Sequence, residues 1–192
     1  MSPQLTVQTP LQLPPSEIPS YLEQLWSHEE GGNKGANTFS LLIWQPSWIE
    51  QKLIQNGINE GALLVSGGIG KPENIKAGYY VKPTIFGKVK NDMSIAREEI
   101  FGPVLSVISY DNEEDAIDIA NDTDYGLAAY VSGSDHNKLL DLARQLNAGQ
   151  VHLNYGSAGS EAPFGGFKQS GNGREKAEWG LEEFIEVKAI MG

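Results

Sequence analysis

The alternation of strand-like and helix-like segments between residues 62 and 154 most restricts what this chain can fold into. Short apolar runs alternate there with amphipathic stretches of roughly 10–15 residues that repeat at helical spacing. Strands joined through helices of that length can lie parallel, because each crossover returns the chain to the same end of the sheet. The sequence therefore predicts an α/β fold with a parallel sheet.

Five strands and two helices make up this prediction. The first helix begins after Asp111, with three acidic residues in its first turn, where the helix dipole favours negative charge, and it ends at Gly126. The second begins at Ser134 or Asp135 and ends at Gly149, with an apolar stripe of Leu139, Leu142, Ala143 and Leu146. The strands are expected at 63–66, 78–88, 104–110, 127–132 and 151–154; the segment 78–88 can instead be one arm of a hairpin, and Pro83 within it implies an edge strand or a bulge.

The first 55 residues follow a different pattern. Residues 1–19 are polar and proline-rich, which favours a flexible arm. Residues 20–55 predict a short α+β segment: a helix opened by Ser20, a buried strand at 39–44, and a helix from about 48 to 60 that Ser47 can cap. We therefore expect three parts, at 1–19, 20–55 and 56–192, with a terminal arm at 175–192.

Composition excludes several classes of function. The chain has no cysteine, which excludes disulfides, zinc–thiolate sites and a thiol nucleophile within it. Its formal net charge of −11 disfavours nucleic acid and anionic membranes as partners. No apolar run approaches the roughly 18 residues of a membrane helix, and no leader of basic then apolar residues opens the chain. We expect a cytoplasmic protein.

The glycine and histidine motifs give no complete site of their own. Gly68 and Gly70 are followed by Pro72, which does not fit a dinucleotide-binding fingerprint, so simple turns are favoured. The glycine-rich stretch 155–173 predicts a functional loop, because long structureless loops are uncommon inside compact domains. His152 lies in an apolar strand and favours a structural over a catalytic histidine. No histidine has metal-ligand spacing, so we expect no metal site.

The interpretation of two further features depends on the residues around them. Glu98 and Glu99 are adjacent, which alone indicates surface charge, but the Gly-Pro turn after Phe101 can hold a carboxylate and a ring at the entrance of the next strand. Residues 182–190 alternate cleanly at the chain's end, which predicts a strand. A terminal strand without a partner exposes its backbone polar groups, so we expect it to join another sheet, either of this chain or of a second subunit.

Several segments, in order and with matching spacing, resemble the NAD(P)-dependent aldehyde dehydrogenase superfamily over about residues 56–192. EEIFGPVLSV (98–107) and PFGGFKQSGNGRE (163–175) are the most specific. The others are GINEGALLVSGG (57–68), GYYVKPTIF (78–86), NDTDYGLAAYV (121–131), LNAGQVHLN (146–154) and GLEEFIEVKAI (180–190).

The resemblance implies a partial catalytic domain of that family, with NAD or NADP as cofactor. Glu99 matches the carboxylate that binds the nicotinamide ribose hydroxyls, and Phe101 the ring beside the nicotinamide. Phe164 matches an aromatic residue that lines the aldehyde tunnel. The last strand matches the arm through which family subunits pair, which implies a homo-oligomer.

The departures from the family are large. Its N-terminal Rossmann-like domain, general-base glutamate, oxyanion-hole asparagine and catalytic cysteine are all absent, and Ala177 stands where the family often has glycine. Family chemistry begins with thiolate attack on the aldehyde. We therefore expect no catalytic residue in this chain, no activity from it alone, and weak or undetectable binding of the cofactor.

Two interpretations stay open. The chain is an aldehyde dehydrogenase remnant, or one part of a split enzyme that needs a complementary subunit. Alternatively, it is a non-enzymatic oligomerisation or redox-enzyme assembly protein. The second rests on ANTFSLLIWQPSWIEQKL (36–53), which resembles the N-terminal segment of the cyanobacterial glucose-6-phosphate dehydrogenase assembly protein.

Overall fold

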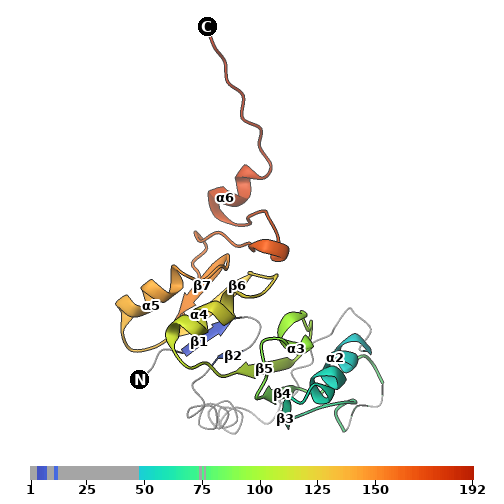
Figure 1. Ribbon diagram of the computed structural model, residues 1–192. Coiled ribbons are helices and arrows are strands. Elements are labelled where there is room, and N and C mark those ends of the chain that lie inside the picture. The colour runs from blue at the N-terminus through green and yellow to red at the C-terminus, as the bar shows by residue number, and fades with distance from the viewer. Residues whose placement is uncertain (1–3, 8–10, 13–47, 74, 76) are drawn as a thin grey trace, which may run out of the picture. The chain divides into compact units, whose positions relative to one another are not determined.

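The computed structural model describes residues 4–7, 11–12, 48–73, 75 and 77–192 (Figure 1). The predicted flexible arm at 1–19 and the helix and strand predicted between 20 and 47 therefore fall mostly or wholly outside the described residues. The chain divides into two compact units. We call residues 9–115 the central unit, and residues 1–8 with 116–192 the C-terminal unit.

The sheet of the central unit has the order β3-β4-β5-β2, with β3 at Leu63–Ser66, β4 at Thr84–Gly87, β5 at Val104–Ile108 and β2 at Leu11–Gln12. β4, β5 and β2 are parallel neighbours. β3 and β4 are antiparallel, which corrects the prediction of a fully parallel sheet. The reason is local: no helix of the described residues lies between these two strands, so the chain returns directly.

The two helices in the described part of the central unit pack on one face of this sheet. α2 spans Trp48–Asn59, close to the predicted bounds, and α3 is the single turn Ser94–Arg97. A Cβ on Gly57 of α2 would lie 2.8 Å from Ile95 and 3.3 Å from Phe86. Ile95 and Phe86 are both buried, and glycine lets α2 approach them closely.

The C-terminal unit has a three-stranded sheet, β1-β6-β7, with β1 at Gln4–Val7, β6 at Ala128–Ser132 and β7 at Gln150–Leu153. β6 and β7 are parallel, as the sequence predicts, and β1 is antiparallel to β6. The helix between β6 and β7 supplies the crossover that parallel strands require.

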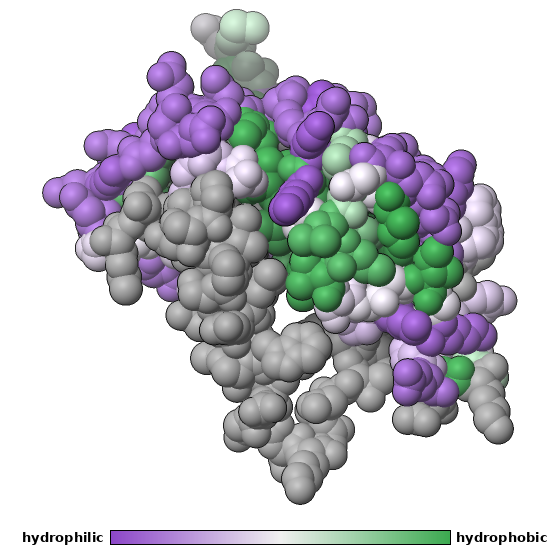
Figure 2. Space-filling view, turned by 60° about the horizontal axis from the view of Figure 1, so that its bottom comes forward, coloured by the Kyte–Doolittle hydropathy of each residue, from purple (hydrophilic) through white to green (hydrophobic). Residues whose placement is uncertain are grey.

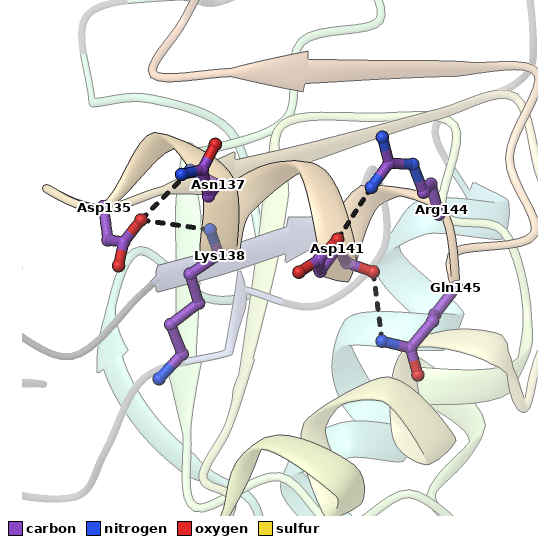
Figure 3. Close-up of polar contacts among 6 residues, drawn as sticks. All are labelled: Asp135, Asn137, Lys138, Asp141, Arg144 and Gln145. Atoms are coloured by element: carbon purple, nitrogen blue, oxygen red, sulfur yellow. Dashed lines mark hydrogen bonds and ion pairs between the residues drawn. The ribbon is translucent and has the colours of Figure 1, made fainter.

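That helix, α5 (His136–Ala143), carries the core of the unit. Its buried Leu139 and Leu142 pack with Leu146 and with Ala129 and Val131 of β6. Asp135 caps it, as one of the two predicted caps, by accepting the backbone N–H groups of Asn137 and Lys138 at 3.0 and 3.2 Å (Figure 3).

α4 (Glu113–Asn121) begins one residue later than the sequence suggests. Asn112, not Asp111, caps it: the Asn112 side-chain oxygen accepts the N–H of Asp115 at 3.0 Å, and the Asp115 carboxylate accepts the N–H of Asp111 at 3.0 Å. No helix in the described part of the chain is long and apolar enough to cross a membrane.

The end of the chain differs most from its prediction. Residues expected to open the terminal strand belong instead to helix α6 (Ala177–Glu182), and residues 185–192 form neither helix nor strand. Val187 and Ile190 are 94% and 91% exposed. An extended segment is stable as a strand only with a neighbour to share its hydrogen bonds, and the described residues offer it none.

Candidate functional site

The two residues predicted to bind cofactor lie on one short loop of the central unit, between α3 and β5. α3 ends at Glu98, whose extended backbone turns the chain toward the strand. The loop is tight, because Gly102 donates to the Ile100 carbonyl at 2.7 Å and Val104 to the Gly102 carbonyl at 2.8 Å. Pro103 then accepts the N–H of Thr84 at 2.9 Å, which fixes the loop to β4.

Glu99 and Phe101 are both exposed on this loop, and Phe101 is 59% exposed. The Glu99 carboxylate has no hydrogen-bond partner among the described residues, so its oxygens are available to a ligand with hydroxyl groups. The Phe101 ring offers an open face for stacking a flat group. The loop therefore presents a carboxylate and an aromatic ring to solvent, two residues apart.

Phe164, predicted to line the aldehyde channel, lies in the C-terminal unit and is half-buried. It forms an antiparallel bridge with Glu175, with N···O distances of 2.9 and 2.6 Å. The Lys176 ammonium lies 5.4 Å from the centre of its ring, which is within cation–π range. The backbone bridge to Glu175 and the Lys176 ammonium on one face of the ring thus fix the position of Phe164.

Phe164 borders a pocket of about 510 Å³ within the C-terminal unit. Arg174 lines it and donates from its guanidinium to the carbonyls of Gly166 and Gly173, at 3.0 and 2.8 Å. The backbone N–H of Arg174 donates to the Glu183 carboxylate at 3.1 Å. The sequence prediction missed Arg174, Lys176 and Glu183; the charged run directly after the glycine-rich stretch was the only local signal for them.

The glycine-rich stretch is an ordered loop with tertiary partners rather than a free one. Phe167 donates to the Gly126 carbonyl at 2.8 Å, and the Lys168 ammonium donates to the carbonyls of Asn121 and Thr123 at 2.7 and 2.8 Å. A Cβ on Gly149 would lie 1.7 Å from the Gly165 carbonyl oxygen, so backbone packs directly on backbone at that point.

His152 has the structural setting that the sequence favours. Its ring stacks on Tyr130 with centroids 4.7 Å apart, and its Nδ1 lies 2.6 Å from the Gly156 carbonyl oxygen. Because a carbonyl only accepts, Nδ1 carries the proton. Among the described residues, no group of three His, Cys, Asp or Glu side chains could hold a metal ion.

The candidate residues thus fall in two places. Glu99 and Phe101 share one exposed loop of the central unit, whereas Phe164 and its pocket belong to the C-terminal unit. Phe164 lines a pocket, Glu99 and Phe101 are exposed on their loop, and neither place contains a nucleophilic thiol.

The sequence model of the aldehyde dehydrogenase family matches residues 49–190, which begins seven residues before the start at 56 given by the motifs. The chain therefore belongs to the aldehyde dehydrogenase family, and its fold is a mixed α/β fragment of that family's fold.

Relatives and solved structures agree with this assignment. The 3-succinoylsemialdehyde-pyridine dehydrogenase of a Pseudomonas species is 52% identical over 142 residues, which cover 74% of this chain and 30% of that protein. The structure of an aldehyde dehydrogenase C mutant from Pseudomonas syringae, with NAD⁺ and octanal, gives a TM-score of 0.82 at 40% identity, over 96% of this chain and 39% of that one.

A Mycobacterium tuberculosis aldehyde dehydrogenase with NAD⁺ gives a TM-score of 0.83 at 39% identity, over 92% of this chain and 38% of that one. The chain therefore spans about 30% of the length of the curated relatives it matches.

Proposed function

We propose that this chain supplies the C-terminal part of an NAD(P)-dependent aldehyde dehydrogenase site and does not oxidise aldehydes alone. One observation carries the proposal: a family match over residues 49–190 in a chain with no cysteine. The resemblance gives the chain a place in the family site, and the missing thiol removes the step that opens the family reaction.

The residues of the chain have binding roles in this proposal. Glu99 accepts hydrogen bonds from the ribose hydroxyls of NAD or NADP, and Phe101 packs beside the nicotinamide, which supplies the hydride acceptor. Phe164 lines the path of the aldehyde. The proposal is supported by the exposure of Glu99 and Phe101 and by the NAD⁺-bound state of structural relatives.

Cofactor affinity of the chain alone should be low. One carboxylate and one ring contribute at most a few kcal/mol, which is no more than the cost of immobilising the ligand. Calorimetry with NAD is expected to give no binding in the low micromolar range.

Self-association belongs to the same proposal. Phe184, Val187 and Ile190 are 87%, 94% and 91% exposed on the terminal arm, and exposed apolar residues in sequence favour association. We propose that the arm becomes a strand by pairing with another copy of the chain. Removing residues 183–192 should reduce the mass measured by light scattering at tens of micromolar. An unchanged mass would contradict this role of the arm.

A covalent chimera tests the proposed function directly. The C-terminal segment of the Pseudomonas 3-succinoylsemialdehyde-pyridine dehydrogenase is replaced by residues 49–190 of this chain, and NADH formation from that enzyme's aldehyde is followed. We expect activity, a raised KM for NAD with Glu99→Gln or Phe101→Ala, and no such change with Glu98→Gln. A folded but inactive chimera would overturn the proposal.

The assembly-protein alternative receives no support from the described residues. Most of the segment that carries it, residues 36–47, lies outside them, and the family match begins at 49, inside the same segment. Only the aldehyde dehydrogenase role is therefore proposed.

A further inference from the structure

The two faces of the sheet in the central unit are covered differently. Phe86 of β4 is fully buried and faces α2 and α3, as its approach to Gly57 shows. Ser106 of β5, its register partner, faces the same way and donates to the Ile95 carbonyl of α3 at 3.0 Å. This face is closed by the helices of the unit itself.

The opposite face carries the intervening residues. Ile85 and Leu105 are register partners that alternate with Phe86 and Ser106, so they point away from α2 and α3, and both are partly exposed. Leu63 and Val65 of β3 lie on this same face, because a Cβ on Gly87 would lie 3.9 and 3.4 Å from them. They are 49% and 43% exposed.

In a complete domain, a sheet with parallel strands rarely leaves an apolar second face exposed. Parallel strands occur almost only in sheets that are covered on both faces, since their residues are apolar on both sides. Figure 2 shows hydrophobic residues gathered on the surface over β3, with hydrophilic residues along part of their border. An apolar area within a polar border is typical of an interaction surface.

We propose that Leu63, Val65, Ile85 and Leu105 form a docking face for the complementary, N-terminal part of an aldehyde dehydrogenase, carried on a separate chain. This inference rests on the proposed function and adds the place of contact. The occupant is argued from length: the match covers 30% of the curated relatives, so most of that family's fold lies outside the residues matched here. An intact α/β fold covers both faces of its sheet, and the described residues of the central unit leave this face partly exposed.

Co-expression tests the docking face with the full chain. The probe is the Pseudomonas 3-succinoylsemialdehyde-pyridine dehydrogenase cut before its similarity to residue 49, carrying a separate tag and made in the same cell, so that each part folds beside the other. We expect the two chains to purify together. Leu63→Glu and Val65→Glu should each reduce the retained probe about tenfold or more, because each places a charge in an apolar contact.

The chain offers a matched control in the same strand. Leu64 is 38% exposed and pairs with Phe86, so it lies on the face closed by the helices. Leu64→Glu should leave probe retention within about threefold of the unaltered chain, since it changes the same chemistry outside the docking face. Melting temperatures check that each variant folds; where Leu63→Glu or Val65→Glu does not, Leu63→Gln and Val65→Thr replace them.

The outcomes separate this inference from the proposed function. No co-purification, or equal losses for Leu64→Glu and Val65→Glu, would overturn the docking face even with an active covalent chimera. A chain that forms dimers broken by Val65→Glu and unaffected by the probe would assign the face to a second copy and likewise overturn it. An inactive chimera with normal co-purification would overturn the proposed function and leave the docking face standing.

Discussion

The two compact units differ in how their polar groups are paired and how their apolar side chains are covered. In the C-terminal unit, Arg174 and Lys168 donate to backbone carbonyls of the unit's own loops. In the central unit, Glu50 is fully buried and neither carboxylate oxygen has a hydrogen-bond partner among the described residues. The described residues of the same unit leave one apolar sheet face partly exposed. The C-terminal unit therefore pairs the polar groups of its own loops, whereas the described part of the central unit leaves a buried carboxylate unpaired and an apolar face exposed.

The largest effect is expected from a substitution at a close backbone–backbone contact in the C-terminal unit, and it measures how far the stability of that unit depends on this contact. Gly149→Ala should destabilise it by about 3 kcal/mol or more, because the added Cβ meets the Gly165 carbonyl at 1.7 Å and the loop must move. Hydrogen exchange of the β7 amides measures the loss. Gly159→Ala is the control, since its Cβ meets nothing within 4 Å. Equal effects of the two substitutions would show that this contact does not hold the loop.

The second substitution lies in the central unit and should raise the stability of the protein rather than lower it. Glu50→Leu replaces a buried carboxylate without partners by an apolar side chain of similar size, and should stabilise α2 by about 2 kcal/mol. Slower exchange of the α2 amides would report it. Lys52→Leu, at an exposed position of the same helix, should change little. A destabilised Glu50→Leu chain would mean that Glu50 has a partner outside the described residues.

A third comparison concerns α5 alone (Figure 3). Asp135→Ala removes a cap that accepts two backbone N–H groups and should cost about 1 kcal/mol. Arg144→Ala breaks a 2.7 Å ion pair with Asp141, yet both side chains are 70% exposed, so solvent screens the pair and the loss should stay below about 0.5 kcal/mol. Exchange of the α5 amides ranks the two. The reverse order would show that the exposed pair matters more than the cap.

Local signals predicted the parts of the fold that depend on neighbours in sequence. The stripe of Leu139, Leu142 and Leu146 is buried, α5 is capped at Asp135, and β6 and β7 are parallel, all as expected. The sequence prediction failed at two places. β3 turned out antiparallel to β4, because no helix of the described residues separates them, and residues 185–192 form no strand and have no strand neighbour among the described residues. For the candidate site, the family resemblance pointed to Phe164 but not to Arg174, whose partners are backbone carbonyls that no pattern marks.

The smallest expected effect concerns the base of the terminal arm. Lys176 has φ 68° and Ala177, the first residue of α6, has φ 51°, so two consecutive residues with side chains have positive φ where α6 begins. A positive φ costs a residue with a Cβ about 1–2 kcal/mol, whereas glycine adopts it freely. Ala177 also stands where the family often has glycine, so this chain has backbone strain at a position where a glycine would have none.

Ala177→Gly should therefore stabilise the C-terminal unit. The gain is reduced by the greater freedom of glycine in the unfolded chain, which leaves about 0.5–1 kcal/mol. Exchange of the Phe164 and Glu175 amides, which form the bridge directly before the strained pair, measures it. Ala158→Gly, at an exposed position without a left-handed φ, should give no gain. If both substitutions lower the stability of the C-terminal unit, residues 176–177 do not hold the left-handed conformation in solution. The backbone at the base of the terminal arm is then unstrained.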